Sequence, residues 1–400
     1  MRQQCLRRGL TLIELLVIIA IVAILAGLLL PAIRSGHGHG HGRRTQCLNN
    51  MRQVALGLIQ SVNAHNVYPN SGTFEEDPTA LASGDPKDSN IYKALSNPAG
   101  FGASGPRHSW VVSILPFIDN QDLFDAFNQN TTYSDTSAEP GKPSNAKIGA
   151  TSIGILTCPD DPTIVDGGGN LSYVVNGGFT RWHADLTGWQ VNADGSWGAG
   201  PALDWGTATA KQTGLMFLGT SKGDAPWDVR TSANSVSDGA GTTIMLSENL
   251  RAGAAPGGVA GLTGTVPTNW ACPHPNFVAF LASDNVCNGG GTGLVGTGSC
   301  GTASPRTQGG KTFGPHWANA NRPGTHENIN AGLKVAEKGG SPYPSSHHAG
   351  SVNVVMCDGS ARFVAEGIDG EVWAKLVTPR GNRLPQPFGQ APLKPGDLDE

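Results

Sequence analysis

The sequence is poor in charge and lacks several patterns that would mark a nucleotide, zinc or redox site. Charged residues make up 14% of the 400 residues, and the net charge is −4. Without a basic excess, the chain has no electrostatic footprint for nucleic acid, so no nucleic-acid partner is expected. The seven cysteines include no CxxC pair, which argues against a cysteine zinc cluster and a thioredoxin-like site. The phosphate-binding P-loop pattern is also absent.

Glycine and proline are abundant instead. The chain holds 56 Gly and 27 Pro, which favours a loop-rich body of short strands over a helical bundle. Its length is sufficient for one large or two ordinary domains with a real core. We therefore predict an α+β fold with many loops.

A long apolar run stands beside a cluster of arginines at the N-terminus. The sequence RRGLTLIELLVIIAIVAILAGLLLPAI covers residues 7–33, and no charged side chain occurs from 15 to 33. As a helix this run measures about 28 Å, close to the hydrocarbon thickness of a bilayer. The arginines should keep the leader in the cytoplasm while the rest is exported. A cleavable signal peptide or an uncleaved anchor would explain the run, but neither explains Glu14 at its edge.

This stretch resembles the class III signal of bacterial type IV prepilins and type II secretion pseudopilins. The resemblance implies a leader of residues 1–9, a cut by prepilin peptidase between Gly9 and Leu10, and methylation of the new N-terminus. Phe is the usual first mature residue in that family, whereas this chain has Leu10. Residues 10–34 would form the transmembrane and assembly helix. Glu14 takes the place of the family's acidic fifth residue, which pairs with a neighbouring subunit's amine and sets the register of stacked helices.

A low-complexity joint follows at residues 35–44, where His37, His39 and His41 alternate with glycine. The three imidazoles are candidate ligands for zinc, copper or nickel, but a flexible joint is the favoured interpretation. Because glycine is a poor helix former, this tract should interrupt the long N-terminal helix. A helical pattern resumes over 45–66, and its apolar stripe consists of Cys47, Met51, Val54, Leu58 and Val62.

Residues 67–400 are predicted to form an exported globular domain of loops and short strands. One buried strand is expected at 242–250, ending in Glu248. This carboxylate could be imagined as an acid catalyst, but pairing with a backbone group or with Arg251 is the favoured role.

Disulfides are expected if this domain lies outside the cytoplasm. Cys287 could close a loop with either of its neighbours in sequence, and a distant partner could take the cysteine left over. The candidates are Cys158, Cys272, Cys287 and Cys300, and the sequence leaves their pairing open.

The stretch HHAGSVNVVMCDGSARFV predicts a hairpin at 348–359, because apolar and polar residues alternate up to the turn at Asp358 and Gly359. The spacing from His348 to Asp358 resembles the H-X9-DG signature of a large prepilin-like family, the domain of unknown function 1559. The segments CLNNMRQ, LTCPDDP, SYVVNGG and TIMLSENL resemble other landmarks of that family. The resemblance covers most of the chain and is weakest over 251–345.

His348 and Asp358 invite a catalytic interpretation, because a His and an Asp can form a base and its orienter. No activated nucleophile is identifiable beside them, and the turn alone explains Asp358. A structural role for His348, Asp358 and Gly359 is therefore favoured. Asp358, Asp369 and Glu371 are candidate calcium ligands, since pseudopilins resembling this chain can bind calcium in a C-terminal loop, although the spacing fits no EF-hand. No other cofactor is expected.

The first functional hypothesis is a structural subunit without enzymatic activity. The implied fold is pilin-like: a long N-terminal transmembrane helix packed on an antiparallel β-sheet head with large loop insertions. The chain would cross the inner membrane once through residues 10–34, with its head in the periplasm or at the cell surface. Its partners would be prepilin peptidase and other pilin-like subunits, in a homo- or hetero-oligomeric pseudopilus or pilus-like structure of the type II secretion kind.

The second hypothesis is an anchored binding protein that uses the signal only for export. Tryptophans in the variable region could stack on the sugar rings of a polysaccharide, although core and loop packing is their favoured role. These are Trp182, Trp189, Trp197, Trp205 and Trp227. An extracellular hydrolase ranks last, because no nucleophile constellation is identifiable.

Overall fold

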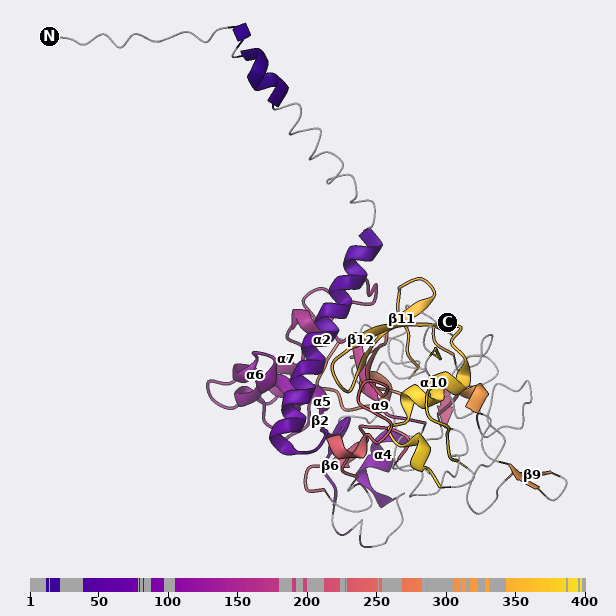
Figure 1. Ribbon diagram of the computed structural model, residues 1–400. Coiled ribbons are helices and arrows are strands. Elements are labelled where there is room, and N and C mark those ends of the chain that lie inside the picture. Colours follow the sequence, from indigo (N-terminus) through magenta and orange to yellow (C-terminus); the bar gives the residue numbers. More distant parts are fainter. Residues whose placement is uncertain are drawn as a thin grey trace.

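The computed structural model is an α+β protein with a long helix beside a head of sheets and loops (Figure 1). The α+β class is as predicted. The structure describes residues 12–13, 15–21, 39–77, 79, 82, 88–96, 105–179, 189–191, 197–199, 212–223, 227, 229–250, 252–253, 268–282, 286, 306–308, 311–313, 317–321, 328–330, 343–385, 388–394 and 396–397.

Helix α2 (His39–His65) begins before the predicted start at residue 45, so residues 39–44 continue the helix rather than interrupt it. Each glycine costs the helix about 1 kcal/mol relative to alanine. Two arginines in this part are tied to the head, because Arg43 pairs with Asp160 and Arg44 donates to Ser351 Oγ. These contacts hold the first turns in place. Residues 35–38 of the predicted joint lie outside the described residues.

The apolar segment before α2 is only partly described. Residues 12–13 and 15–21 are helical, and their large apolar side chains are exposed. Within the described part of the chain, none of the helices combines the length and the apolar character needed to cross a bilayer. Most of the segment predicted to span the membrane, residues 10–34, falls outside that part.

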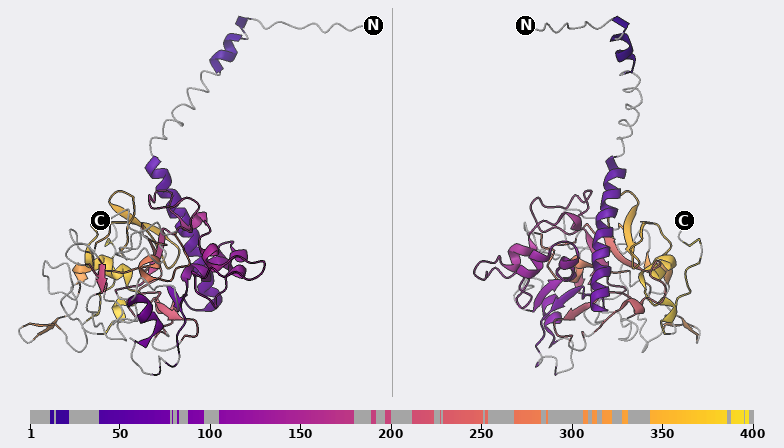
Figure 2. Two further views of the ribbon diagram at one scale, coloured as in Figure 1. Left: turned by 180° about the vertical axis from the view of Figure 1, so that it is seen from behind. Right: turned by 60° about the vertical axis from the view of Figure 1, so that its left-hand side comes forward.

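The predicted stripe of α2 is confirmed. Its five members are at most 5% exposed. Helix α2 runs along the head in all three views (Figures 1 and 2) and packs against strands β11 and β7. A period of three to four residues therefore turns one helix face to the core. The stripe consists of Cys47, Met51, Val54, Leu58 and Val62.

The main sheet has the strand order β12-β11-β7-β3-β8. Neighbouring strands are antiparallel, except that β8 is parallel to β3, so the expectation of a wholly antiparallel sheet is wrong. The chain leaves β7, passes through α9 (Pro275–Val278) and joins the sheet beyond β3, in the direction of β3. The strands are β3 (Tyr173–Asn176), β7 (Ile244–Glu248), β8 (Ala279–Phe280), β11 (Ser351–Met356) and β12 (Ala361–Ala365).

Strands β11 and β12 form the predicted hairpin, with Val355 opposite Ala361. Gly359 adopts a φ of 84°, a left-handed conformation that glycine takes without steric cost. Helix α10 (Gly370–Val377) follows, capped by Asp369, and buries Trp373.

A smaller sheet has the order β2-β1-β6, built from β1 (Gly72–Phe74), β2 (Pro106–Ser109) and β6 (Leu218–Thr220). Strand β1 is antiparallel to β2 and parallel to β6. Other described α-helices and strands are α4 (Asn90–Ser96), α5 (Trp110–Ile114), α6 (Gln121–Ala126), α7 (Asn145–Gly149), β4 (Trp189–Val191), β5 (Trp197–Ala199), β9 (Arg306–Gln308) and β10 (Lys311–Phe313).

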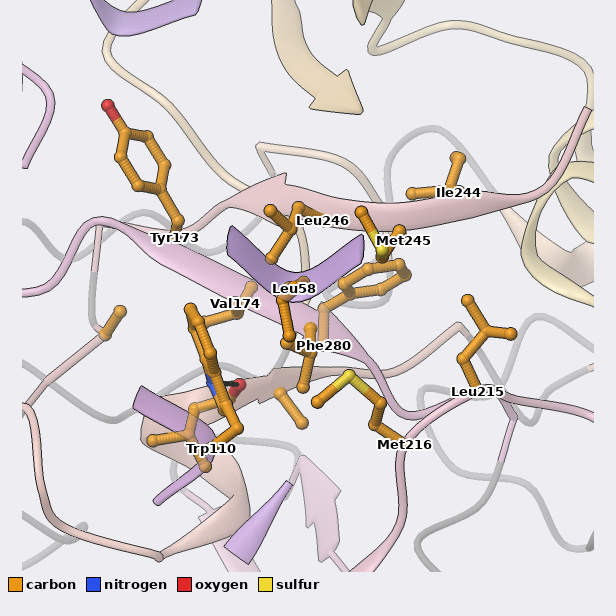
Figure 3. Packing of buried hydrophobic residues seen from close by; sticks show 14 of the residues in the cluster. Leu58, Trp110, Tyr173, Val174, Leu215, Met216, Ile244, Met245, Leu246 and Phe280 are labelled. Atoms are coloured by element: carbon orange, nitrogen blue, oxygen red, sulfur yellow. Dashed lines mark hydrogen bonds between the residues drawn. The ribbon is translucent and has the colours of Figure 1, made fainter. Parts of the chain in front are cut away.

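The core lies between α2, α5 and the main sheet. Leu58 of α2 and Trp110 of α5 gather there with Val174 and Phe280 from two strands (Figure 3). Trp110 donates its indole N–H to Val278 O at 2.9 Å, so its one polar atom is satisfied. The Tyr173 hydroxyl points away from the other labelled side chains (Figure 3) and lies 3.1 Å from the Cys47 carbonyl oxygen of α2.

Candidate functional site

Four segments that are far apart in sequence bring their polar or sulfur-bearing side chains together at one end of the main sheet. Cys47 comes from α2, Cys158 from the turn after residue 156, Glu248 from the end of β7, and His348 from the loop before β11. One ligand-type atom from each lies within 4.8 Å of those of the other three, and all four residues are buried. We call these four residues, with Asp160, the histidine cluster.

A disulfide joins Cys47 to Cys158 across a sequence separation of 111 residues. It ties α2 to the LTCPDDP turn. Tyr173 reinforces this link, because its hydroxyl lies 3.1 Å from the carbonyl oxygens of both Cys47 and Thr157. The cross-link therefore fixes the helix against the head at the edge of the cluster.

This pairing corrects the disulfide expectations. Cys158 is bonded, but its partner is Cys47, which the sequence analysis placed only in the apolar stripe. Cys272 is a free, buried thiol. Burial raises its pKa to about 12, so the thiol stays protonated at neutral pH. Cys287 and Cys300 lie outside the described residues.

His348 stands between two carboxylates. Its Nε2 lies 3.2 Å from Glu248 Oε1, and its Nδ1 lies 3.3 Å from Asp160 Oδ2. The same Nε2 is 3.7 Å from Cys158 Sγ. Each ring nitrogen of His348 therefore has a carboxylate oxygen within hydrogen-bonding reach. The side chain is 3% exposed, so this arrangement is shielded from solvent.

Glu248 is held by the strand next to its own. Asn353 of β11 donates its backbone N–H to Oε2 at 2.9 Å and its side-chain amide to Oε1 at 2.8 Å. A buried carboxylate needs such donors, since desolvation is costly for an ion. Glu248 was predicted to pair with a backbone group or with Arg251. Its described partners are the Asn353 backbone and side chain and His348, and Arg251 lies outside the described residues.

Two arginines of α2 border the cluster. Arg43 lies 3.4 Å from Asp160. Arg44 sits over the Phe363 ring and donates to Ser351 Oγ at 2.8 Å. Burial lowers the pKa of Arg44, and the negative charge of Glu248 partly offsets that effect. The positive charges thus complement the acidic side of the cluster.

The two aspartates of LTCPDDP have different partners. Asp160 faces His348, whereas Asp161 folds the turn itself by accepting hydrogen bonds from Thr163 and Ser172. Sequence reasoning missed Asp160 and Cys47 as partners of His348.

The other predicted site residues do not join the cluster. Asp358 lies at the opposite end of β11 from His348, is exposed, and accepts the Ser360 N–H at 2.8 Å, so the two do not form a dyad. Asp369 caps α10 by accepting the N–H groups of Glu371 and Val372. Among the described residues, one group of acidic, His and Cys side chains lies close enough together to share a metal ion. None of the three calcium candidates belongs to that group.

The predicted N-terminal sites lie outside the described residues. These are Gly9, Leu10, Glu14 and His37. Helix α2 includes His39 and His41, but their side chains are likewise not described.

Comparison with known proteins gives two family matches. Residues 6–30 match the prokaryotic N-terminal methylation motif. Residues 41–371 match the family described as "Protein of unknown function (DUF1559)", and this range contains every member of the histidine cluster. No curated protein and no solved structure matches the chain. Because that match covers most of the sequence, the chain belongs to the DUF1559 family and carries a prepilin-type methylation motif ahead of it.

Proposed function

We propose that this protein is a pilin-like structural subunit that is cut after Gly9, methylated at Leu10, and assembled into a pseudopilus or pilus-like filament. The observation that carries the proposal is the methylation motif over residues 6–30. It precedes a helix, α2, whose apolar face is buried on a mixed sheet. A long N-terminal helix on a sheet head is the arrangement that a pilin-like subunit requires.

The exposed side chains of the N-terminal segment support the same proposal. Leu12, Ile13 and the apolar residues at 15–19 and 21 are 51–79% exposed. Contiguous apolar surface of this kind is unfavourable in water, so lipid or neighbouring helices should cover it. A membrane anchor that later packs in a filament meets both needs. We therefore place the anchor in the inner membrane and the head on its exported side.

Glu14 provides the test of assembly. In a bundle of parallel helices its carboxylate would pair with the free amine of a neighbouring chain. Glu14→Ala should therefore abolish filament formation but leave export and the cut after Gly9 unchanged. Glu371→Ala, at an exposed position of the head, is the matched control and should assemble normally. Normal filaments from Glu14→Ala would contradict the proposal.

An anchored binding protein is the competing function. Trp227 is 1% exposed and belongs to the core, so it cannot stack on a ligand at the surface. Trp189 and Trp197 lie on the paired strands β4 and β5. An unassembled binder would be indifferent to Glu14→Ala, so the same experiment separates the two functions.

We propose no enzymatic activity. The segment GTSKG at 219–223 has the spacing of a nucleophile elbow, which requires a sharp turn from a strand into a helix. Ser221 instead lies in an exposed bend after the three-residue strand β6. The histidine cluster is buried and pairs its imidazole with carboxylates, and neither feature presents a nucleophile to a substrate.

A further inference from the structure

We propose that the histidine cluster is a zinc site when Cys47 and Cys158 are reduced, with the two thiolates, His348 Nε2 and Glu248 Oε1 as its four ligands. This inference does not depend on filament assembly. It rests on the convergence of four buried ligand-type atoms, all within 4.8 Å of one another.

The ligand types and their spacing suit tetrahedral zinc. Zinc in proteins is bound by thiolates at about 2.3 Å and by imidazole nitrogen or carboxylate oxygen at about 2.0–2.2 Å, which places pairs of ligand atoms roughly 3–4 Å apart. Nε2 of His348 already lies 3.2 Å from Glu248 Oε1 and 3.7 Å from Cys158 Sγ. Two sulfurs and one imidazole select zinc over calcium or magnesium, which take oxygen ligands.

The groups behind the ligands are also those of a metal site. A zinc-bound histidine usually donates its other ring N–H to a carboxylate, which fixes the tautomer. Here Nδ1 faces Asp160 Oδ2 at 3.3 Å and can donate its proton to it, so that Nε2, which faces Glu248 Oε1, would be the metal-binding nitrogen. Glu248 is oriented by both donors of Asn353. Asp160 and Asn353 therefore already hold His348 and Glu248 in the disulfide form, and reduction must separate the two sulfurs before zinc can bind between them.

Charge is close to balanced. Two thiolates and one carboxylate carry three negative charges against the two positive charges of zinc, and the Arg44 guanidinium lies close enough to Glu248 to interact with its charge.

Zinc and the disulfide compete for the same two sulfurs. A dithiol reductant cleaves the Cys47–Cys158 bond, gaining its own disulfide and leaving two thiols. Zinc binding then releases one proton from each thiol and forms two Zn–S bonds. An oxidant such as a protein disulfide would take the two electrons back and release the metal. The disulfide links only α2 and the LTCPDDP turn, whereas zinc would also link β7 and the loop before β11.

The test uses the full chain in detergent, without an added histidine tag. Protein is reduced with a dithiol under anaerobic conditions, loaded with Zn²⁺, desalted and assayed for bound zinc per chain. Reduced wild type should hold one more zinc than the oxidised protein. His348→Ala should lose that zinc, whereas His347→Ala should keep it, because His347 is exposed next to it in sequence. Any zinc on the His-Gly tract is the same in all samples and cancels.

Two further measurements cover the case in which His348→Ala does not fold. Asp160→Asn, which leaves all four ligands intact, should weaken zinc affinity by about 10- to 100-fold. Reduced wild type loaded with Co²⁺ should show the intense visible bands of a tetrahedral thiolate site. Equal zinc in reduced and oxidised protein, or an octahedral cobalt spectrum, would overturn the proposal.

Discussion

Two histidines are buried to nearly the same extent, yet their surroundings differ. His108 is 7% exposed and His348 is 6% exposed. His108 packs edge-on against Phe127, and its Nδ1 lies 3.2 Å from the carbonyl of the next residue. Burial lowers the pKa of His108 to about 4. The hydrogen bond to Ser109 opposes this shift, and the positive charge of Arg107 adds to it. His348 has a carboxylate at each ring nitrogen instead.

The difference teaches that burial alone does not decide what a histidine does. His108 is a neutral packing residue, and charging it would cost stability. His348 holds two acidic groups and a cross-linked helix together.

Removing the disulfide next to His348 should have the largest effect. The double variant Cys47→Ser, Cys158→Ser opens the loop that the disulfide closes between two residues 111 positions apart. In the chain-entropy view this lowers the free energy of unfolding by about 5 kcal/mol. Urea unfolding of the oxidised wild type and the variant measures the difference. A loss below about 1 kcal/mol would mean that the cross-link contributes little to the head.

Removing the imidazole of His348 should lower the free energy of unfolding somewhat less than removing the disulfide. His348→Ala leaves the buried carboxylate of Glu248 without one of its polar partners and should destabilise the protein by about 3 kcal/mol. His347→Ala, at the exposed neighbour, should change stability by no more than about 0.5 kcal/mol. The same urea titration checks both variants. Equal losses of stability in the two variants would show that the buried contacts of His348 do not stabilise the protein.

His108 should give the protein an acid-sensitive component of stability. Its folded pKa of about 4 lies below the ordinary 6.5, so the unfolded chain binds a proton more readily between these values. This contribution is fully present above pH 6.5 and is lost as the pH falls towards 4, amounting to about 3 kcal/mol. His108→Phe should reduce the loss over that window. Parallel stability curves for wild type and variant would show that His108 does not titrate in this way.

The far end of β11 should be the least sensitive. Asp358→Ala removes one exposed hydrogen bond to the Ser360 N–H and should cost about 1 kcal/mol or less. Thermal unfolding against wild type is a sufficient measurement. A loss of stability as large as that of His348→Ala would indicate that His348 and Asp358 share one structural role. That result would contradict their separation along the strand.

Local patterns predicted the elements of this fold well. The period of the α2 stripe depends only on residues within one helix, and the Asp358-Gly359 hairpin depends on one alternation and one turn. The start of α2 was misplaced because contacts of Arg43 and Arg44 with the head outweigh the low helix propensity of the glycines before them.

The histidine cluster was beyond the reach of such patterns. Successive members of the set Cys47, Cys158, Glu248 and His348 are separated by about a hundred positions in the sequence. They meet only because of the strand order β11-β7-β3 and the position of α2 on that sheet. Each residue taken alone also has a simpler explanation: a stripe position, a turn, a strand end or a hairpin start. Only their convergence distinguishes the site.

Processing of the N-terminal motif as in a prepilin underlies the proposed function. Intact mass and N-terminal sequence of the protein extracted from membranes test it most directly. We predict a chain that begins at Leu10, with or without one added methyl group on the new amine. A chain that begins at Met1, or one cut beyond Ile33, would contradict the account.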